Sequence, residues 1–479
     1  MHRVRSESPL SAGLAFLLAV MPLAYVDVAN AQSTSWTNTP PSSHDAATST
    51  GRTDAPVLAD RVYALPELLT IALDISPKTR EVEQEAVQAN LAIQLAKSQY
   101  SPQLDVKALG GIQRTPLAIP RNVSAKGYFV SSTQEVFPSL ELKWLLFDFG
   151  RRKGQVEEAR HNASAAQSGL LGAQEKLVFD VSEAYFEATS AQGQVRAAKK
   201  ALEAAQLTEQ AVADQKRHGR ATVVQLAEAQ RQTAAMRLAL TKSTGAADTA
   251  FASLLATIGL PPETHFQIAP PADASTTQPL APLRELIDEA LQSRPDVLAA
   301  TDKIAASDAK IETARAAYRP TISLSAQVFQ NIGKISSDGG PYSSIDRNGN
   351  ALFVSFEWPL FDGGTRATNV SMAVSQKTAA EDALAETKDA ASQQVVQAYN
   401  NLKTSLDNRN QALAYTHASE LAYQAALDSY RRGLATITDL TSNEAVLAQA
   451  EAGQEDADAN VGIAHAALDL AIGRRPSSP

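Results

Sequence analysis

The sequence contains no cysteine, which excludes disulfide bonds, thiolate metal sites, a cysteine nucleophile and a lipid anchor on an N-terminal cysteine. Aromatic residues make up only 6%, which is low for a large globular core, and the net charge is −9. An acidic balance gives no support to nucleic-acid binding, so we expect no nucleic-acid partner. Beyond the N-terminal segment, no run of 18 apolar residues predicts a transmembrane helix.

Recognisable catalytic patterns are also missing. The seven histidines are scattered and none has the HExxH spacing, and neither a GxSxG elbow nor a P-loop occurs. The many carboxylates in helical segments are most simply solvated faces. We therefore predict no enzymatic activity, no metal site and no cofactor.

The N-terminus has the pattern of a secretory signal peptide, predicted over residues 1–31. Basic residues come first, an apolar stretch runs from Leu10 to Leu23, and Ala29-Asn30-Ala31 forms a small-x-small cleavage site. A retained anchor is the alternative. Residues 32–61 are rich in Ser, Thr, Pro and Asp, which predicts a disordered leader.

What the sequence does contain is a tandem repeat. A glycine separates a basic pair from a β-branched run in two similar segments, Lys216–Leu226 and Tyr430–Leu440, and Gly433 lies 214 positions after Gly219. Glycine tolerates the left-handed conformation that ends a helix, so each segment predicts a turn between two helices. Two unrelated helix-ending glycines are the alternative. The similarity extends much further, so we predict a first repeat over residues 62–262, a join over 263–282 and a second repeat over 283–476.

Each repeat contains two stretches in which apolar and polar residues alternate, which is typical of half-buried strands. These predict strands at about 102–112, 128–147, 320–330 and 351–361, with loops over 113–126 and 331–350. About ten tilted residues suffice to span a bilayer as a strand. Four strands cannot close a barrel, whereas three copies would give twelve. A soluble domain of two hairpins is the alternative.

Long helical hairpins are predicted after the strands, at 150–258 and 364–472. From Val156 to Ala205, fifteen a and d positions of a heptad pattern are all apolar, with one four-residue stutter. A seam of this length predicts a coiled coil, and its many alanines let helices approach closely.

The segment Trp358–Gly364, followed by a long helix, resembles the strand-to-helix junction of TolC-like outer-membrane efflux proteins, and Tyr430–Leu440 resembles their periplasmic helical tip. The resemblance covers residues 62–476. It implies a mixed, mainly α fold: a homotrimer whose protomers contribute four transmembrane strands each to a twelve-stranded β-barrel in the lipid of the outer membrane. Long antiparallel coiled-coil helices would extend it as an α-barrel into the periplasm. It also implies two partners, a periplasmic adaptor protein and an inner-membrane pump that is proton-driven or an ABC transporter.

The resemblance also suggests functional residues. Adaptor contacts map to the two tips, at Gly219, Arg220, Ala221, Thr222, Gly433, Leu434, Ala435 and Thr436. Asp439 matches one acidic ring of the family's periplasmic gate, and Glu228 is a second gate candidate. Ser442, Ala435 and Gln225 replace charged residues of the archetype, which puts its ion-pair network in doubt here. We expect Trp144 and Trp358 to be aromatic residues at the membrane interface.

Three classes of function follow. The first is an exit duct for multidrug efflux or type I protein secretion, with the exported drug, metal or protein left open. The second is a structural or adhesive coiled-coil surface protein, which would place its strands once, at the C-terminus. The third is a porin, which would carry many strands and little helix. Two internal pairs of strands among long helices favour the duct.

Overall fold

The computed structural model describes residues 61–123, 125–270 and 280–474. The predicted signal peptide lies outside these residues, as does the predicted leader apart from Arg61. The chain separates into two units, residues 1–54 and 55–479, and all described residues belong to the second.

One order of elements occurs twice. The first copy comprises β1 (Val62–Tyr63), α1 (Leu65–Ile75), α2 (Pro77–Ser98), β2 (Gln103–Ala118), β3 (Tyr128–Phe147), α3 (Arg151–Arg217) and α4 (Val223–Ile258). The second comprises β4 (Gln267–Ile268), α5 (Leu283–Ser293), α6 (Pro295–Ala316), β5 (Thr321–Ser337), β6 (Ser343–Glu357), α7 (Thr365–Arg431) and α8 (Ile437–Ile472). Equivalent helices have equal lengths of 11, 22, 67 and 36 residues. Differences in length between the copies are therefore confined to strands and connections.

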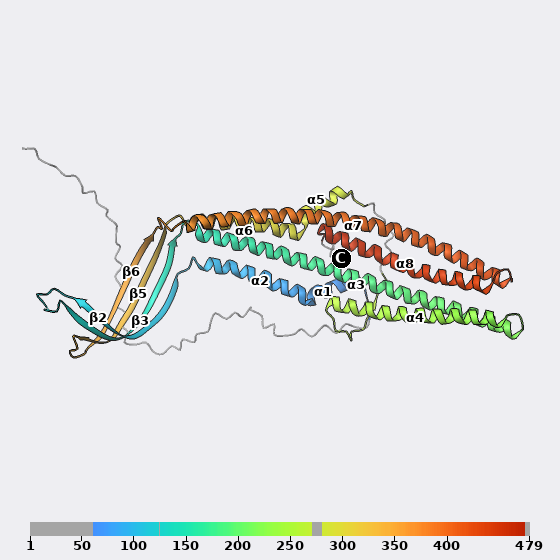
Figure 1. The fold of residues 1–479 in the computed structure, drawn as a ribbon, viewed down its shortest axis with the longest axis horizontal. Helices are drawn as coiled ribbons and strands as arrows, with labels where there is room; N and C mark the ends of the chain where they lie inside the picture. Colours follow the sequence, from blue (N-terminus) through green and yellow to red (C-terminus); the bar gives the residue numbers. More distant parts are fainter. Residues whose placement is uncertain (1–60, 124, 271–279, 475–479) are drawn as a thin grey trace, which may run out of the picture. The chain divides into compact units, whose positions relative to one another are not determined.

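The strands and the helical turns lie at opposite ends of the long helices, as Figure 1 shows. A helix of 67 residues is about 100 Å long at 1.5 Å per residue. Along α3, none of the fifteen apolar seam positions is exposed. Small residues permit this packing: a Cβ atom added to Gly462 of α8 would lie 2.5 Å from the ring of Phe186 of α3. The two repeats are thus in close contact along their helices.

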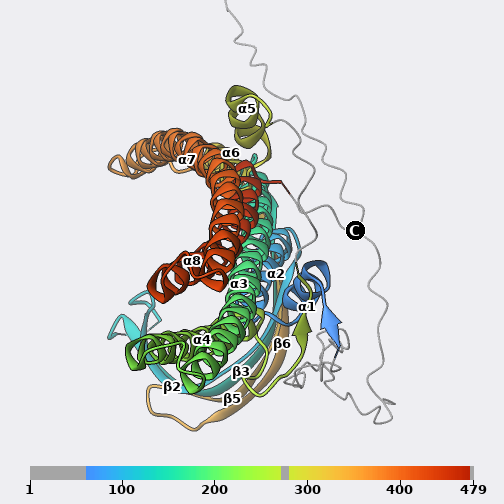
Figure 2. The same cartoon turned by 90° about the vertical axis from the view of Figure 1, so that its right-hand side faces the viewer.

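The sheet has the order β2-β3-β5-β6 and every neighbouring pair is antiparallel. Its central pair, β3 and β5, joins the two repeats, and β2 and β6 are the edges. Figure 2 shows that the sheet is curved.

The strand ends differ from the sequence prediction. Pairing continues through Gln113↔Thr133 and Ile335↔Ser343 into the segments predicted as loops, because backbone hydrogen bonds do not require apolar side chains. The connections consequently shorten to residues 119–127 and 338–342. At its other end β6 stops at Glu357 rather than 361, shortly before Pro359, which has no N–H to continue the ladder.

In this sheet the apolar face is exposed and the polar face is covered, the reverse of the arrangement in a soluble protein. The apolar face, called the outward face below, includes Val106 and Ile112, whose side chains are 82% and 79% exposed. Ser131 and Ser139 on the other face are only 7% and 8% exposed. An exposed contiguous apolar face of this kind needs a non-aqueous neighbour.

Apolar cores occur in equivalent places of the two repeats, where the short helices α1 and α5 pack against the long ones. Leu68 of α1 is fully buried against Val181 and Tyr185 of α3, and Leu286 of α5 is buried against Val395 and its neighbours on α7. The parallel pair β1–β4 links the beginnings of the repeats next to the first of these cores. These clusters hold the long helices together at mid-length.

Candidate functional site at the helical tips

Both helical hairpins turn through the same backbone motif. Gly219 and Gly433 have φ angles of 70° and 76°, a left-handed conformation that favours glycine. The N–H of Arg220 donates to the carbonyl of Gln215 at 2.8 Å, and the N–H of Leu434 donates to the carbonyl of Ser429 at 2.8 Å. The N–H of Gly219 donates to the carbonyl of Lys216 at 2.9 Å, and the N–H of Gly433 donates to the carbonyl of Tyr430 at 3.0 Å. Together these bonds complete two Schellman motifs, which satisfy the last carbonyls of α3 and α7.

The helices that leave the tips begin with reciprocal capping boxes. The N–H of Gln225 donates to Thr222 Oγ1 at 3.2 Å, and Gln225 Oε1 accepts from the N–H of Thr222 at 2.8 Å. In the second tip Asp439 takes the place of glutamine and its Oδ2 accepts from the N–H of Thr436 at 2.9 Å. Each tip is therefore a rigid five-residue turn, stabilised at both ends by local hydrogen bonds.

The tips present an exposed surface. Leu434 is 79% exposed, and Val223 and Val224, directly after the first tip, are 67% and 78% exposed. A Cβ atom on Gly219 or Gly433 would meet no atom within 4 Å, so only the backbone angle restricts these positions. Exposed apolar residues on rigid turns are suited to contact with a partner protein.

A shared apolar cluster joins the two tips. We call it the tip cluster: Val212 of α3, Ala229 of α4, and Ile437 and Leu440 of α8 are buried together, with Tyr430 of α7 packed against them. The Tyr430 hydroxyl also donates to Gln215 Oε1 of α3 at 3.4 Å. Four helices from both repeats are thus packed together at this end.

The two gate candidates from the sequence have different surroundings. Thr436 donates to Asp439 from its N–H and, at 2.6 Å, from its hydroxyl, and these bonds hold the pKa of Asp439 below its ordinary value. Glu228 forms an ion pair with Arg231 one turn along α4, at 2.6 Å. Within the described residues no hydrogen bond or ion pair joins Glu228 to Asp439. Asp439 therefore caps the beginning of α8, and its gate role stays a prediction.

Sequence reasoning missed a buried acid behind the tip cluster. Glu444 lies one turn after Leu440 on α8 and is 3% exposed. Neither of its carboxylate oxygens has a hydrogen-bond partner, and burial raises its pKa to about 7. The titratable neighbour is Tyr423 of α7, whose own pKa is raised by burial and by Glu444. No sequence signal distinguishes Glu444 from the many exposed carboxylates on the helices.

The predicted aromatic residues lie at the opposite end, where strands meet helices. The indole N–H of Trp144 donates to the carbonyl of Tyr100 at 2.8 Å, and that of Trp358 donates to the carbonyl of Tyr318 at 3.1 Å. Both rings remain partly exposed, at 38% and 54%. An indole ring whose apolar atoms are exposed and whose N–H is hydrogen-bonded is suited to a membrane–water boundary.

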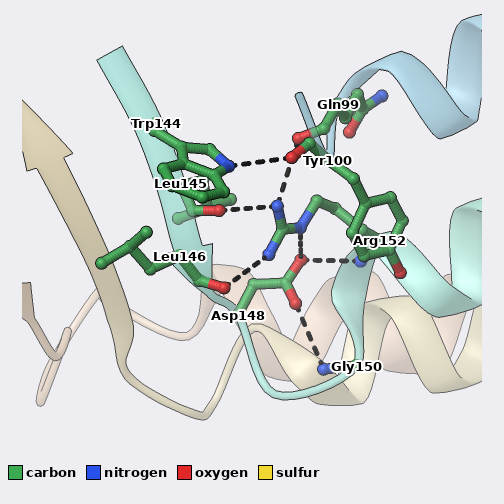
Figure 3. Close-up of polar contacts among 8 residues, drawn as sticks. All are labelled: Gln99, Tyr100, Trp144, Leu145, Leu146, Asp148, Gly150 and Arg152. Carbon is green, nitrogen blue, oxygen red and sulfur yellow. Dashed lines mark hydrogen bonds and ion pairs between the residues drawn. The ribbon is translucent and has the colours of Figure 1, made fainter. Parts of the chain in front are cut away.

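A buried arginine organises this junction and was also missed. Figure 3 shows Arg152 at the start of α3, where its Nε donates to Asp148 at 2.9 Å. Its other nitrogens donate to the carbonyls of Leu145 and Leu146 at 2.6 and 3.1 Å, and the guanidinium lies over the ring of Tyr100. Arg152 therefore donates to carbonyls near the end of β3, beyond its last pair with β2.

The second repeat has an equivalent arrangement, in which Arg366 donates to Asp362 at 2.7 Å and its guanidinium lies over the ring of Tyr318. The signal in the sequence is an aspartate after an aromatic residue, with an arginine four positions later, in both copies. Among the described residues, no helix has the length and apolar character needed to cross a membrane.

The sequence matches the family described as outer membrane efflux protein over residues 68–260 and 286–474, one segment in each repeat. The chain belongs to this family. The matched segments begin inside α1 and α5 and end just after α4 and α8, so each repeat matches the family once.

Individual relatives agree with this assignment. Protein CyaE of Bordetella pertussis is 27% identical over 413 residues, covering 84% of this chain and 82% of CyaE. Outer membrane protein OprJ of Pseudomonas aeruginosa is 25% identical over 376 residues, covering 77% and 75%. The open state of the Neisseria gonorrhoeae MtrE outer membrane channel superposes with a TM-score of 0.66 at 22% identity, covering 87% and 90%, which shows the same fold.

Proposed function

We propose that this efflux-family protein is one of three identical subunits of a passive exit duct through the outer membrane. The observation that carries the proposal is the sheet, whose outward face is apolar and exposed. In the part of the chain that the structure describes, the edge strands β2 and β6 each have no neighbouring strand on their outer side. In lipid, each unpaired backbone group costs several kcal/mol, so the edges must pair with other chains. Three four-stranded sheets would close a barrel of twelve strands, an even number that such barrels have.

The long helices would continue the duct into the periplasm. They pack through an alanine-rich seam within one chain, and their ends form the tip cluster. The competing proposal is a structural or adhesive coiled-coil surface protein. Its strands would come once, at the end of the chain, whereas here each repeat contributes a hairpin to one sheet. The membership in an efflux family also favours the duct.

Docking of a periplasmic adaptor is assigned in this proposal to the two tips. The surface offered comprises Gly219, Arg220, Ala221 and Thr222 of the first tip and Gly433, Leu434, Ala435 and Thr436 of the second. Rigid turns with exposed apolar neighbours lose little conformational freedom when a partner binds. An inner-membrane pump would then be coupled through the adaptor, and the pump would select the exported compound.

The periplasmic gate is assigned to Asp439, with Glu228 as the second candidate. Capping holds Asp439 ionised at the beginning of α8, at the narrow end of the proposed duct. Three symmetry-related carboxylates would repel one another, favour cations and bind a multivalent cation. Glu228 is partly neutralised by Arg231, which makes it the weaker candidate.

Assembly provides the test of the proposal. The natural chain has no cysteine, so one cysteine can be introduced on β2 and one on β6 without interference from other thiols. We expect oxidation to link the edges of different chains into a species of three, and the mass in detergent to equal three chains. Cysteines on the interior strand β3 provide the control and should not cross-link between chains. A stable monomer in the outer membrane would contradict the proposal.

A further inference from the structure

The outward face of the sheet changes from apolar to basic at its far end from the helices. On β2 the side chains of this face are apolar from Leu104 to Ile112, and the next one is Arg114. On β5 the same change occurs between Ile332 and Lys334. The apolar stretch of β2 covers about 27 Å of strand, which is the length scale of the apolar band of a membrane barrel.

The strand register brings these two basic residues to one place. Arg114 is paired with Ser132 of β3, and Lys334 is paired with Gln134 of β3. Ser132 and Gln134 are two residues apart on the same strand and therefore point to the same face. Arg114, Ser132, Gln134 and Lys334 form what we call the rim patch, in which two cations flank a hydroxyl and an amide at a lateral separation of roughly 10 Å.

The charge at this end of the sheet is unbalanced. Residues 113–134 contain three basic side chains, Arg114, Arg121 and Lys126, and no carboxylate, in a chain whose net charge is −9. Among the described residues, neither these three nor Lys334 forms an ion pair or a side-chain hydrogen bond. Lys107 on the opposite face, by contrast, binds Glu141 at 2.5 Å.

Two acids lie near the rim patch. Asp338, directly after β5, accepts from the N–H of Val130 through its Oδ1 at 2.8 Å. Asp346 of β6 is paired with Ile332, diagonally across from Lys334, and its Oδ1 accepts from Gln330 at 2.8 Å. Among the described residues, no ion pair joins either acid to Arg114 or Lys334. Arginine, lysine, a hydroxyl and an amide in one exposed group provide the donors that phosphate oxygens require.

We infer that the rim patch binds the phosphate of a phosphorylated glycolipid in the outer leaflet of the membrane. Its acyl chains would lie along the apolar outward face below, and its headgroup would meet Arg114 and Lys334. The orientation used here rests on the proposed function, which puts the helices in the periplasm and the rim at the cell surface. Each chain of a trimer would present one such patch.

The test uses the full-length protein, purified from outer membranes in detergent and depleted of lipid. Binding of lipid A that carries two phosphates is measured by native mass spectrometry and compared with dephosphorylated lipid A. The variant combines Arg114→Gln with Lys334→Gln, and Lys107→Gln on the opposite face is the matched control. A swap of Arg114→Lys with Lys334→Arg preserves the charge, and inorganic phosphate serves as competitor.

We expect the double Gln variant to bind phosphorylated lipid A at least about tenfold more weakly, because two charge-assisted contacts are lost. The control and the charge-preserving swap should bind nearly as wild type does, and dephosphorylated lipid A should bind at the level of the double variant. Equal binding of both lipids, or unchanged binding by the double variant, would overturn the inference. Full competition by millimolar inorganic phosphate would also overturn the inference, since the site would then be a binding site for free phosphate. These outcomes are distinct from failure of the proposed function, which would appear as a protein that does not assemble.

Discussion

Replacing the buried Glu444 should strengthen the tips and remove a pH dependence that the wild-type protein has. The carboxyl lies behind the tip cluster without a hydrogen-bond partner, and burial raises its pKa from 4.5 to about 7. Tyr423, its titratable neighbour, has a raised pKa as well and stays neutral in this range. Ionisation of Glu444 therefore opposes the packed state and favours an opened state in which water reaches the side chain.

The magnitude follows from the two pKa values. Below 4.5 the carboxyl is protonated in both states and its effect on opening does not vary with pH. Between 4.5 and about 7 only the opened state ionises, so the stability of the closed tip falls as pH rises and levels off above 7. The full difference amounts to about 3 kcal/mol per chain, at 1.36 kcal/mol per pH unit. From about pH 5 to pH 8 opening should become roughly 70-fold more favourable.

Hydrogen exchange of the assembled protein measures this opening. Peptides covering residues 437–447 should lose protection by about that factor between the two pH values, after correction for the intrinsic exchange rate. Glu444→Gln should remove the pH dependence because an amide does not ionise, and Glu444→Met should in addition raise protection throughout. Glu451→Met is the control: Glu451 lies on the same helix as Glu444 but forms an ion pair with Lys200 of α3, so this variant should keep the pH dependence.

The reasoning about Glu444 would be refuted if protection in the wild type and in Glu444→Gln changed in parallel with pH. Such a result would mean that the carboxyl is hydrated or paired in the assembled protein. It would leave the proposed duct untouched, since the assembly test does not depend on this residue.

Three further predictions concern the tips and the junction. Gly433→Val should abolish export while the protein still assembles, because a β-branched residue at a φ of 76° distorts the turn; a bulky charge at Leu434 should act likewise, and normal export by both variants would count against docking at the tip. In planar-bilayer recordings, multivalent cations should block the wild-type channel, and Asp439→Ala should lose this block and weaken the cation selectivity. Unchanged block and selectivity would exclude Asp439 from the constriction. Arg152→Met should lower the free energy of unfolding of the assembled protein by several kcal/mol per chain, because it removes the ionic partner of the buried Asp148 carboxylate. Arg160→Met, which removes an exposed ion pair, should lower the free energy of unfolding by less than about 1 kcal/mol.

The features that the sequence revealed are those with a local or periodic cause. The glycines at 219 and 433 marked both helical turns because no other residue type adopts their backbone conformation so readily. The apolar seam of α3 indicated its packed face, and the family resemblance pointed to the class of protein that the family match confirms. The docking and gate residues drawn from that resemblance stay predictions.

Other features depend on contacts that sequence spacing does not reveal. The strands run past their apolar residues because pairing with a neighbour satisfies the backbone whatever the side chains are. Arg152 donates to the carbonyls of Leu145 and Leu146, which lie beyond the last pair of β3 with β2 and beside an irregularity in its register with β5. This arrangement is a property of the three-dimensional junction. Glu444 differs from exposed glutamates only in the helices that surround it.

The central strand pair β3–β5 joins the hairpin of the first repeat to the hairpin of the second. In a closed ring, β6 of one chain would pair with β2 of the next and join the hairpins of different chains in the same way. A trimer would then be a ring of six hairpins of two alternating kinds, threefold in symmetry but nearly sixfold in shape. The tips alternate in chemistry as well, since Arg220 of one kind corresponds to Leu434 of the other, and Gln225 corresponds to Asp439. Identical adaptor molecules that dock at neighbouring tips would therefore meet two different surfaces and could not all bind with the same affinity.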